Sequence, residues 1–551
     1  MSRGAEPLVE IENLVVRFGD VGPNRVNGIS LKIARGECVA LVGESGSGKS
    51  VTARTITGQS GWRSQVSADV LRFDGRDILS LGEDEWARIR GARIGFVMQD
   101  ALGSLDPLRT VGKEVGETLR LHTSLTRQGR EEKVIELLRS VGVPEPDLRA
   151  QQYPRQLSGG QRQRALIASA IACDPELLIA DEPTTALDAA VQAQVVRLLE
   201  SLRRPNRSML IVSHDLAVVA ELADRIAVMH QGSIIEEGPT ERILEAPQHP
   251  YTRGLLHAAR ALHASSNVIA LAPVLKRPPE SEPAPVLISA RNLAKAFTGP
   301  DHKRRSAVQD VSFDLATGET LGIVGESGCG KTTVTRLILG LEKPESGTVE
   351  LRGRPWSDLK ERERRAARKR IQVVFQDPLA SFDPRYTVGR VLDEAIEIAG
   401  TRDRKARQAR AEELIRLVQL DPSLLARRPT ELSGGQRQRV AIARALAPEP
   451  DVLICDEPVS ALDVYVQAQI LDLLADLKTR LGLSCIFISH DLGVIQRISD
   501  RVLVMHAGLV VEEGPVRDVF AAPRHEYTRK LIDAILPVSS ARNTHRKLAH
   551  A

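Results

Sequence analysis

Two stretches of the chain have the glycine spacing of a phosphate-binding loop. Residues 43–50 read GESGSGKS and residues 325–332 read GESGCGKT, each directly after a short apolar run. In the pattern G-x-x-x-x-G-K-[ST], glycines let backbone N–H groups turn toward phosphates, and the following helix presents its positive end to the same anion. The alternative is a glycine-rich surface turn, but the apolar strand before each loop argues against it. The predicted phosphate-binding residues are Gly43, Glu44, Ser45, Gly46, Ser47, Gly48, Lys49, Ser50, Gly325, Glu326, Ser327, Gly328, Cys329, Gly330, Lys331 and Thr332.

The last two residues of each loop have predictable roles. We expect Lys49 and Lys331 to reach the β- and γ-phosphates of ATP. The hydroxyls of Ser50 and Thr332 are expected to bind Mg²⁺. ATP and Mg²⁺ are therefore the predicted cofactors.

Each half of the chain has a second apolar run, after its loop, that ends in two acids. Residues 177–183 read LLIADEP and residues 452–458 read VLICDEP. We expect Asp181 and Asp456 to support Mg²⁺, and Glu182 and Glu457 to polarise the water that attacks the γ-phosphate. General base catalysis of this kind typically contributes a factor of about 10²–10⁴ in rate.

Single polar residues follow two more buried strands in each half. Gln99 and Gln376 come after residues 94–98 and 371–375, and His214 and His490 come after residues 209–213 and 485–489. The carboxyl ends of strands in an open α/β sheet are where ligands bind. We expect each glutamine oxygen to reach Mg²⁺ or the attacking water, and each histidine to contact the γ-phosphate. A lone histidine after a strand is usually structural, but its repetition favours the functional interpretation.

A glycine pair opens a further helix in each half. Residues 157–164 and 432–439 both read LSGGQRQR. A serine cap followed by glycines exposes free N–H groups to an anion. The predicted second contact surface for the nucleotide consists of Ser158, Gly159, Gly160, Gln161, Ser433, Gly434, Gly435 and Gln436.

The repeated motifs divide the chain into two copies of one domain. A length of 551 residues suits two domains, which we place at 8–262 and 286–540, with a proline-rich linker at 263–285 and a tail at 541–551. Alternating apolar residues from 8 to 18 predict a strand of an antiparallel sheet before the first loop. Phe18 and Phe297 end the first strand of each copy. Their rings are predicted to stack on adenine, the alternative being ordinary core aromatics.

Composition narrows the class of protein. A net charge of +4 without a long block of one sign gives no indication of nucleic-acid binding. The five cysteines are scattered without a C-x-x-C pair, which argues against disulfide and zinc frameworks and fits a reducing cytosol. We expect no signal peptide and no membrane-spanning segment, so any membrane crossing would need other subunits.

The motifs, in this order and in both halves, resemble those of ATP-binding cassette (ABC) ATPases. The resemblance implies an α/β fold with two tandem ABC ATPase domains, each a RecA-like phosphate-loop core with an antiparallel β subdomain and a helical subdomain. It also implies an intramolecular head-to-tail pseudo-dimer. Lys49 would then share its nucleotide with Ser433, and Lys331 with Ser158.

The stretches HPYTR at 249–253 and HEYTR at 525–529 resemble the oligopeptide, dipeptide and nickel import branch of that family. This implies a peripheral ATPase at the cytoplasmic face of the inner membrane, with two transmembrane permease subunits and an extracytoplasmic solute-binding protein. The solute stays open among peptides, glutathione, opines and nickel chelates. The alternative is a soluble twin-cassette ATPase acting on ribosomes or nucleic acid, which the short linker disfavours.

We predict that the protein holds neither an iron–sulphur cluster nor structural zinc. Some members of this branch carry a cysteine cluster after the Tyr-Thr-Arg motif, but here no cysteine follows Tyr251 before Cys329, and none follows Tyr527. Metal analysis of anaerobically purified protein tests this. Stoichiometric iron with acid-labile sulphide would contradict it.

Overall fold

The computed structural model describes residues 6–19, 22–185, 187–262, 284–298, 303–460 and 462–535. The predicted tail and most of the predicted linker lie outside these residues. The first half contains the strands β1 (Val9–Phe18), β2 (Asn24–Ile33), β3 (Cys38–Val42), β4 (Ser64–Ser67), β5 (Val70–Phe73), β6 (Arg76–Asp77), β7 (Ile94–Val97), β8 (Leu177–Asp181), β9 (Ser208–Ser213), β10 (Arg225–His230) and β11 (Ser233–Pro239). Its helices are α1 (Lys49–Thr55), α2 (Glu83–Ile89), α3 (Ala101–Ser104), α4 (Val111–His122), α5 (Arg127–Ser140), α6 (Pro146–Ala150), α7 (Gly159–Ala170), α8 (Ala189–Ser201), α9 (Leu216–Leu222), α10 (Thr240–Glu245) and α11 (Pro250–Leu262).

The second half repeats this order with few changes. Its strands are β12 (Val286–Thr298), β13 (Arg304–Ala316), β14 (Thr320–Val324), β15 (Ser346–Leu351), β16 (Arg354–Pro355), β17 (Ile371–Val374), β18 (Val452–Asp456), β19 (Ser484–Ser489), β20 (Arg501–His506) and β21 (Leu509–Pro515). Its helices are α12 (Lys331–Ile338), α13 (Glu361–Ala367), α14 (Val388–Ala399), α15 (Arg404–Leu417), α16 (Gly434–Leu446), α17 (Val464–Leu481), α18 (Leu492–Ile498), α19 (Val516–Ala521) and α20 (Glu526–Asp533).

A mostly parallel sheet forms the body of each half. In the first half its strand order is β11-β10-β3-β9-β8-β7, and only β11 runs antiparallel to its neighbour. The strands β3, β8 and β9 are buried along their whole length, as their continuous apolar runs predict for a sheet covered on both faces. The predicted functional residues follow β3, β7, β8 and β9. They therefore meet at one edge of the sheet.

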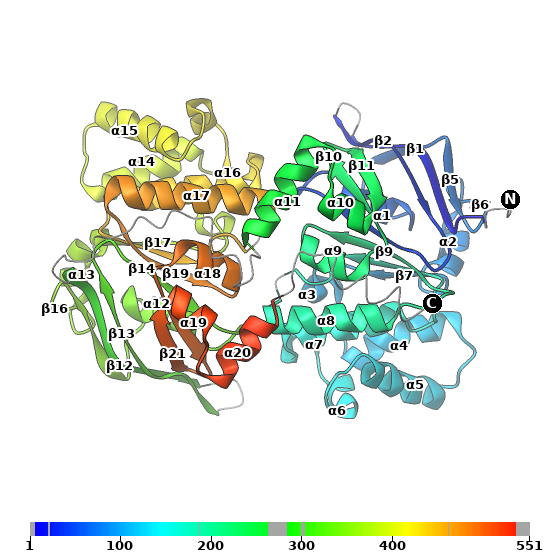
Figure 1. Cartoon of the computed structure of the whole chain (residues 1–551), viewed down its shortest axis with the longest axis horizontal. Helices are drawn as coiled ribbons and strands as arrows, with labels where there is room; N and C mark the ends of the chain where they lie inside the picture. The colour runs from blue at the N-terminus through cyan, green and yellow to red at the C-terminus, as the bar shows by residue number, and fades with distance from the viewer. Residues whose placement is uncertain are drawn as a thin grey trace.

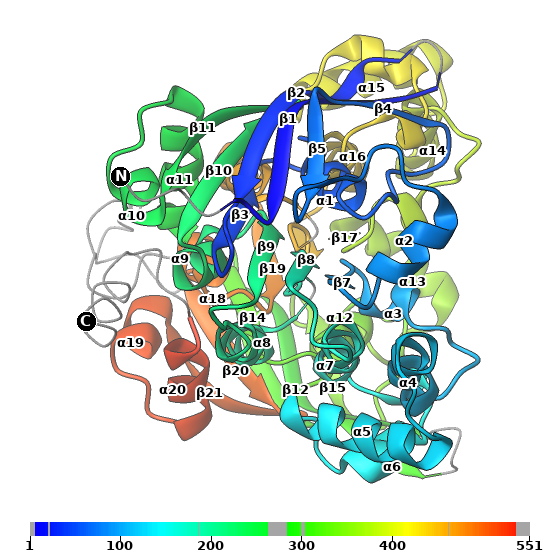
Figure 2. The same ribbon diagram turned by 90° about the vertical axis from the view of Figure 1, so that its right-hand side faces the viewer.

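An antiparallel layer packs beside each parallel sheet. In the first half β1 pairs with β2, β4 and β5, and its buried residues alternate as the sequence predicts. In the second half a single pairing of Asp310 with Leu509 joins the two layers into one ten-stranded sheet. The antiparallel strands lie at one end of the first half and helices α4–α6 at the other (Figure 2). Both parts of the predicted fold are therefore confirmed.

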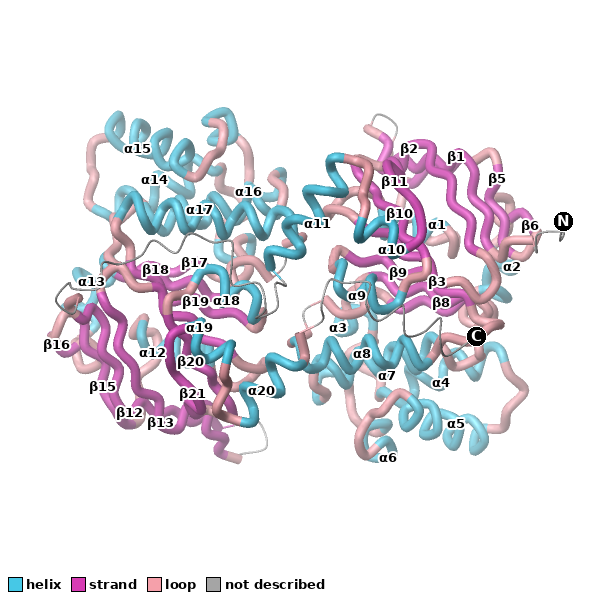
Figure 3. The backbone as a smooth tube through the Cα atoms, in the orientation of Figure 1, coloured by secondary structure: helices cyan, strands magenta, loops and turns pink. Residues whose placement is uncertain are grey.

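The two halves lie side by side and in opposite orientations (Figure 1). The helical group α14–α16 lies at the top of the view, whereas α4–α6 lie at the bottom (Figure 3). Helix α11 of the first half packs against α17 of the second, and α20 of the second packs against α8 of the first. One cluster of buried apolar residues runs through both halves. Among the described residues, no helix is both long and apolar enough to span a bilayer.

We predict that Gly95→Ala destabilises the first half. A methyl group at Gly95 in β7 would lie 2.2 Å from the carbonyl oxygen of Ala170, at the end of α7. Backbone cannot easily move aside, so we expect a loss of about 1–3 kcal/mol in the free energy of unfolding. Urea unfolding of the full chain measures it.

Gly82→Ala is the matched control, because a methyl group there meets nothing within 4 Å. Equal unfolding midpoints for the two variants would contradict the prediction.

Candidate functional site

The first phosphate loop is built against the end of β10. Gly43 has a φ of 149°, and a methyl group on it would lie 2.1 Å from the carbonyl oxygen of Met229. Gly325 has the same relation to Met505, with a φ of 159° and a distance of 2.2 Å. These close approaches explain why the first loop position must be glycine in both halves.

The loop lysine is buried and bonded within the loop. Lys49 is 4% exposed, and its ammonium nitrogen donates to the carbonyl oxygens of Gly43 (2.8 Å) and Glu44 (2.7 Å). Burial lowers the pKa of Lys49, and the nearby carboxylates of Glu182 and Asp463 oppose that shift. In the second half Lys331 makes the same two bonds, to Gly325 (2.7 Å) and Glu326 (2.9 Å).

The residues at the predicted magnesium position fit a hard cation. Ser50 Oγ donates to Asp181 Oδ1 at 2.8 Å. Asp181 is fully buried, and its Oδ2 atom has no hydrogen-bond partner among the described residues, with Arg54 3.9 Å away. Burial raises the pKa of this carboxyl group. A buried oxygen pair of this kind, completed by phosphate oxygens, is the donor set that Mg²⁺ takes in ATPases.

The corresponding residues of the second half, Thr332 and Asp456, are arranged differently. Burial, and then the neighbouring charge of Glu457, raise the pKa of Asp456 to about 6. Among the described residues no hydrogen bond joins Thr332 to Asp456. Among the described residues, the serine or threonine and the aspartate predicted to bind magnesium are hydrogen-bonded to each other in the first half and not in the second.

The acid that follows each aspartate has a strained backbone. Glu182 has a φ of 48° and Glu457 a φ of 49°, in the left-handed region that residues with a side chain rarely adopt. The N–H groups of both residues donate to the next strand, to Val212 (2.8 Å) and Ile488 (3.0 Å). Strain of this kind costs about 1–3 kcal/mol and persists where surrounding structure imposes it.

Each strained glutamate pairs with the predicted histidine. His214 Nδ1 lies 3.4 Å from Glu182 Oε1, and His490 Nδ1 lies 3.2 Å from Glu457 Oε2. Burial would raise the pKa of Glu182, but the bond and charge of His214 outweigh burial and lower the pKa to about 2. Burial would lower the pKa of His214, but Glu182 raises it above its usual value. The carboxylate therefore stays ionised at neutral pH.

The two predicted glutamines have different partners. Gln99 Nε2 donates to Glu182 Oε2 at 2.8 Å, and Thr185 Oγ1 donates to the same oxygen at 2.9 Å. Gln376 Nε2 instead donates to Ser460 Oγ at 3.4 Å. Gln99 is therefore hydrogen-bonded to Glu182, whereas among the described residues Gln376 makes no hydrogen bond to Glu457.

The serine caps at the glycine pairs form as the sequence predicts. Ser158 Oγ accepts from the Gln161 N–H (3.3 Å), and the Gln161 side chain accepts from the Ser158 N–H (3.0 Å). Ser433 and Gln436 repeat both bonds at 3.3 and 3.0 Å. The glutamine side chain is thus used for capping.

The second half reaches the phosphate loop of the first. Ser45 N–H donates to Asp463 Oδ2 at 3.3 Å, across 418 residues of sequence. Asp463 caps α17, and its neighbour Leu462 lies 3.2 Å from the Cβ position of Gly434. The segment 462–463 of the second half thus contacts the loop of the first half and the glycine pair of its own half. Burial raises the pKa of Tyr527, and the charge of Asp188 in the first half contributes in the same direction.

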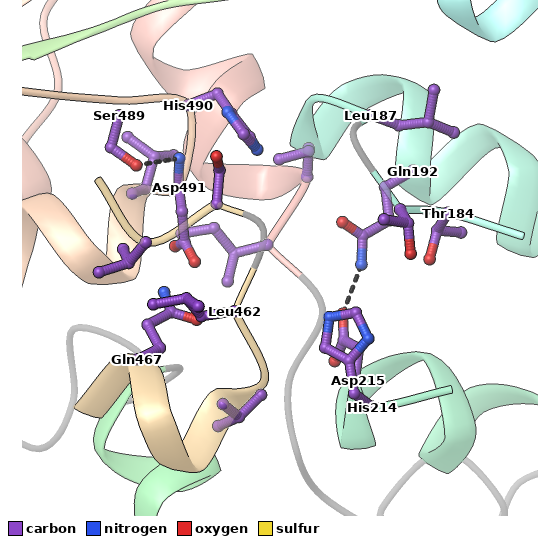
Figure 4. A pocket seen from close by; sticks show the side chains of 18 residues that line it. Thr184, Leu187, Gln192, His214, Asp215, Leu462, Gln467, Ser489, His490 and Asp491 are labelled. Atoms are coloured by element: carbon purple, nitrogen blue, oxygen red, sulfur yellow. Dashed lines mark hydrogen bonds between the residues drawn. The ribbon is translucent and has the colours of Figure 1, made fainter. Parts of the chain in front are cut away.

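A cavity of about 130 Å³ lies where the halves meet. Figure 4 shows His214 and Asp215 on one side of it and His490 and Asp491 on the other. Gln192 Nε2 donates to Asp215 Oδ2 at 2.6 Å and closes part of the wall. Both predicted histidines therefore border one shared space.

Comparisons with known proteins identify the family of this chain. The sequence model of the ABC transporter family matches residues 26–185 and 308–460, together more than half of the chain. This chain belongs to the ABC transporter family. A second family model, the C-terminal region of oligopeptide/dipeptide transporters, matches residues 235–284 and 511–550 of this ABC protein.

Relatives of this ABC protein are similar along almost the whole chain. The glutathione import ATP-binding proteins GsiA of Escherichia coli O157:H7 and Pectobacterium atrosepticum are 42% and 40% identical to it. The matches cover 96% and 98% of this chain and 89% and 91% of theirs. A dimeric ATP-binding cassette, MJ0796, solved after hydrolysis with ADP and phosphate, is 30% identical over 42% of this chain and 99% of its own, with a TM-score of 0.39.

The family membership confirms three predictions. The protein is an ATPase that uses ATP with Mg²⁺, it has two tandem ABC domains, and it belongs to the peptide-type transporter branch. The soluble alternative that acts on ribosomes or nucleic acid is not supported, because the second model describes a transporter region in both halves.

Sequence reasoning missed two groups of residues in this ABC ATPase. The pair Leu-Asp occurs at 187–188 and again at 462–463, and the bond of Asp463 to Ser45 joins the halves. The stretch HPYTR at 249–253 contains Tyr251, whose hydroxyl accepts from the Glu44 N–H in the phosphate loop. The repetition of both motifs was a signal, but nothing in the sequence shows what each contacts.

The predicted adenine-stacking residues stay predictions. Phe18 is half-buried and packs partly against the core of the first half. Phe297 is 40% exposed, and Lys295 Nζ lies 5.5 Å from the centre of its ring. Neither contact decides between stacking and a structural role.

We predict that the double variant Glu182→Gln, Glu457→Gln binds ATP but loses hydrolysis by at least about 100-fold. Glutamine preserves the shape of each side chain but cannot accept a proton from the attacking water. Single-turnover hydrolysis and equilibrium binding of ATP measure the two effects separately.

Glu131→Gln, on the exposed face of α5, is the matched control. Residual turnover above a few per cent of the parent rate would show that these carboxylates are not the bases.

Proposed function

We propose that this protein is the peripheral ATPase of an importer for glutathione or a short peptide of similar size, bound at the cytoplasmic face of the inner membrane. The observation that carries this proposal is the near full-length similarity to glutathione import ATP-binding proteins. The repeated transporter region in both halves supports it. Two transmembrane permease subunits and an extracytoplasmic solute-binding protein are the proposed partners, and no nucleic acid.

The proposed domain limits remain 8–262 and 286–540. The last helix of the first half, α11, ends at Leu262, and the first strand of the second half, β12, begins at Val286. Tying both ATPase domains into one chain raises their effective concentration for closure onto each other.

We propose two composite ATP sites, each made by the phosphate loop of one half and the LSGGQ serine of the other. The bond between Ser45 and Asp463 and the contact of Leu462 with the Gly434 position support the first site. In each site the loop lysine would bind the outer phosphates. The free N–H groups behind Ser433 or Ser158 would close on the γ-phosphate from the other half.

The proposed chemistry is an in-line attack of water on the γ-phosphorus. The Glu182 or Glu457 carboxylate would orient this water and accept its proton as the bond to the leaving ADP breaks. His214 or His490 would hold the glutamate in place through the bond described above. Bound Mg²⁺, held by the Ser50 and Asp181 pair or by Thr332 and Asp456, would neutralise charge on the phosphates.

The experiment that tests the transport function uses the assembled complex. The protein should copurify with two membrane permeases encoded beside it, and its ATPase rate in vesicles should rise when the solute-binding protein carries glutathione. If the ATPase rate rose with dipeptides but not with glutathione, the transported solute would be a peptide and not glutathione. Association with ribosomes, with no effect of permeases on ATPase, would overturn the proposal.

We predict that Ser433→Arg stops hydrolysis of the ATP held by Lys49. The helix N-terminus behind Ser433 carries roughly half a positive charge and favours the γ-phosphate, whereas an arginine at the cap fills the space that the phosphate must enter. Lys49→Ala disables the same site, so combining it with Ser433→Arg should add little further loss. Single-turnover hydrolysis measures the loss in each variant.

Lys49→Ala with Ser158→Arg is the matched comparison, because this pair disables both sites. The opposite result would be that adding Ser158→Arg to Lys49→Ala causes no further loss of hydrolysis, whereas adding Ser433→Arg does. Each half would then use its own LSGGQ stretch, and the proposal of composite sites would be wrong.

A further inference from the structure

The phosphate loop of each half is bonded by a tyrosine from the end of the same half. The Glu44 N–H donates to Tyr251 Oη at 3.1 Å, and the Glu326 N–H donates to Tyr527 Oη at 3.0 Å. These pairs are separated by 207 and 201 residues in sequence. The same bond in two halves with different sequences argues that it serves a shared purpose.

The second residue of the loop is held from two sides. The Glu44 N–H is bonded by Tyr251, and its carbonyl oxygen accepts from Lys49 Nζ. In the second half Tyr527 and Lys331 hold Glu326 in the same way. The tyrosine hydroxyl therefore fixes the second loop residue, and the carbonyl oxygen of that residue holds the lysine ammonium group.

Each tyrosine is itself fixed by its surroundings. The ring of Tyr251 packs on His230 with centroids 4.2 Å apart, and its N–H donates to His249 Nδ1 at 3.2 Å. Tyr527 packs on His506 at 4.0 Å, and its N–H donates to His525 Nδ1 at 3.1 Å. The histidine rings His230 and His506 end β10 and β20, the strands against which the loops are built.

A carboxylate anchors the segment that carries each tyrosine. Glu236 in β11 accepts from the N–H groups of Gln248 (2.8 Å) and His249 (3.0 Å). Glu512 in β21 accepts from the N–H groups of Arg524 (2.8 Å) and His525 (3.1 Å). In both halves, therefore, the backbone just before the tyrosine is fixed by two hydrogen bonds to a glutamate of β11 or β21.

We propose that Tyr251 and Tyr527 are positioning residues for ATP binding, whose hydroxyls hold the phosphate loop so that its lysine keeps its place for the phosphates. A tyrosine that only attached α11 or α20 to the domain would need its ring and not its hydroxyl. The bond to the loop backbone is what distinguishes the two roles. Phenylalanine at either position keeps the ring and removes only that bond.

The test uses the full chain in the Glu182→Gln, Glu457→Gln background, with equilibrium dialysis of labelled ATP. Tyr251→Phe should weaken one of the two binding sites by about three- to tenfold, and Tyr527→Phe the other, as the loss of one hydrogen bond implies. The double variant should weaken both. The melting temperature without nucleotide should stay at the parent value.

With the catalytic glutamates intact, the KM for ATP should rise while kcat changes by less than about twofold, since the loop holds phosphates before and during the reaction. Tyr153→Phe is the matched control, because this tyrosine is exposed. ATP affinity within twofold of the parent in both variants would overturn the proposal. So would a fall in affinity matched by an equal fall in thermal stability, because that would show a purely structural role.

Discussion

Burial of the parallel strands is the constraint on which the rest of the structure depends. Strands β3, β8 and β9 are covered on both faces, and between their ends they carry apolar side chains only. A polar residue can therefore stand only where a strand ends. Because β7, β8, β9 and β3 are neighbours, four such ends meet at one edge of the sheet and place lysine, acids, glutamine and histidine together. The packing of the core thus gathers at one edge of the sheet the charged and polar side chains that ATP hydrolysis needs.

The charge at this edge is balanced locally in each half. The buried Asp181 has Ser50 on one oxygen, and the strained Glu182 has His214 on one oxygen and Gln99 with Thr185 on the other. The second half keeps the strain and the histidine pair, but among the described residues its glutamine bonds to Ser460 and not to the glutamate. The two sites of this ABC ATPase thus share their chemistry and differ in their hydrogen bonds.

The two halves meet through residues that follow the catalytic acids. Asp463 caps a helix of its own half and accepts a bond from the loop of the other, while Leu462 packs on its own glycine pair. One short segment therefore contacts the phosphate loop of the other half and the glycine pair of its own half. On the other side of the same loop, Tyr251 holds the neighbouring residue from within its own half. Adjacent loop residues are in this way fixed by two different helices that pack on each other, α11 and α17.

The sequence by itself determined everything that depends on neighbours along the chain. The loop glycines, the acids that end β8 and β18, and the serine caps all act within a few residues, so spacing alone predicted them. Only the tertiary structure decided the rest. The left-handed backbone of Glu182 is imposed by bonding to β9, and Gln376 differs from Gln99 although their surroundings in sequence are alike. The contacts of Tyr251 with Glu44 and of Asp463 with Ser45 join residues hundreds of positions apart. Such contacts depend on how helices and sheets pack, and no local pattern of side chains records that packing.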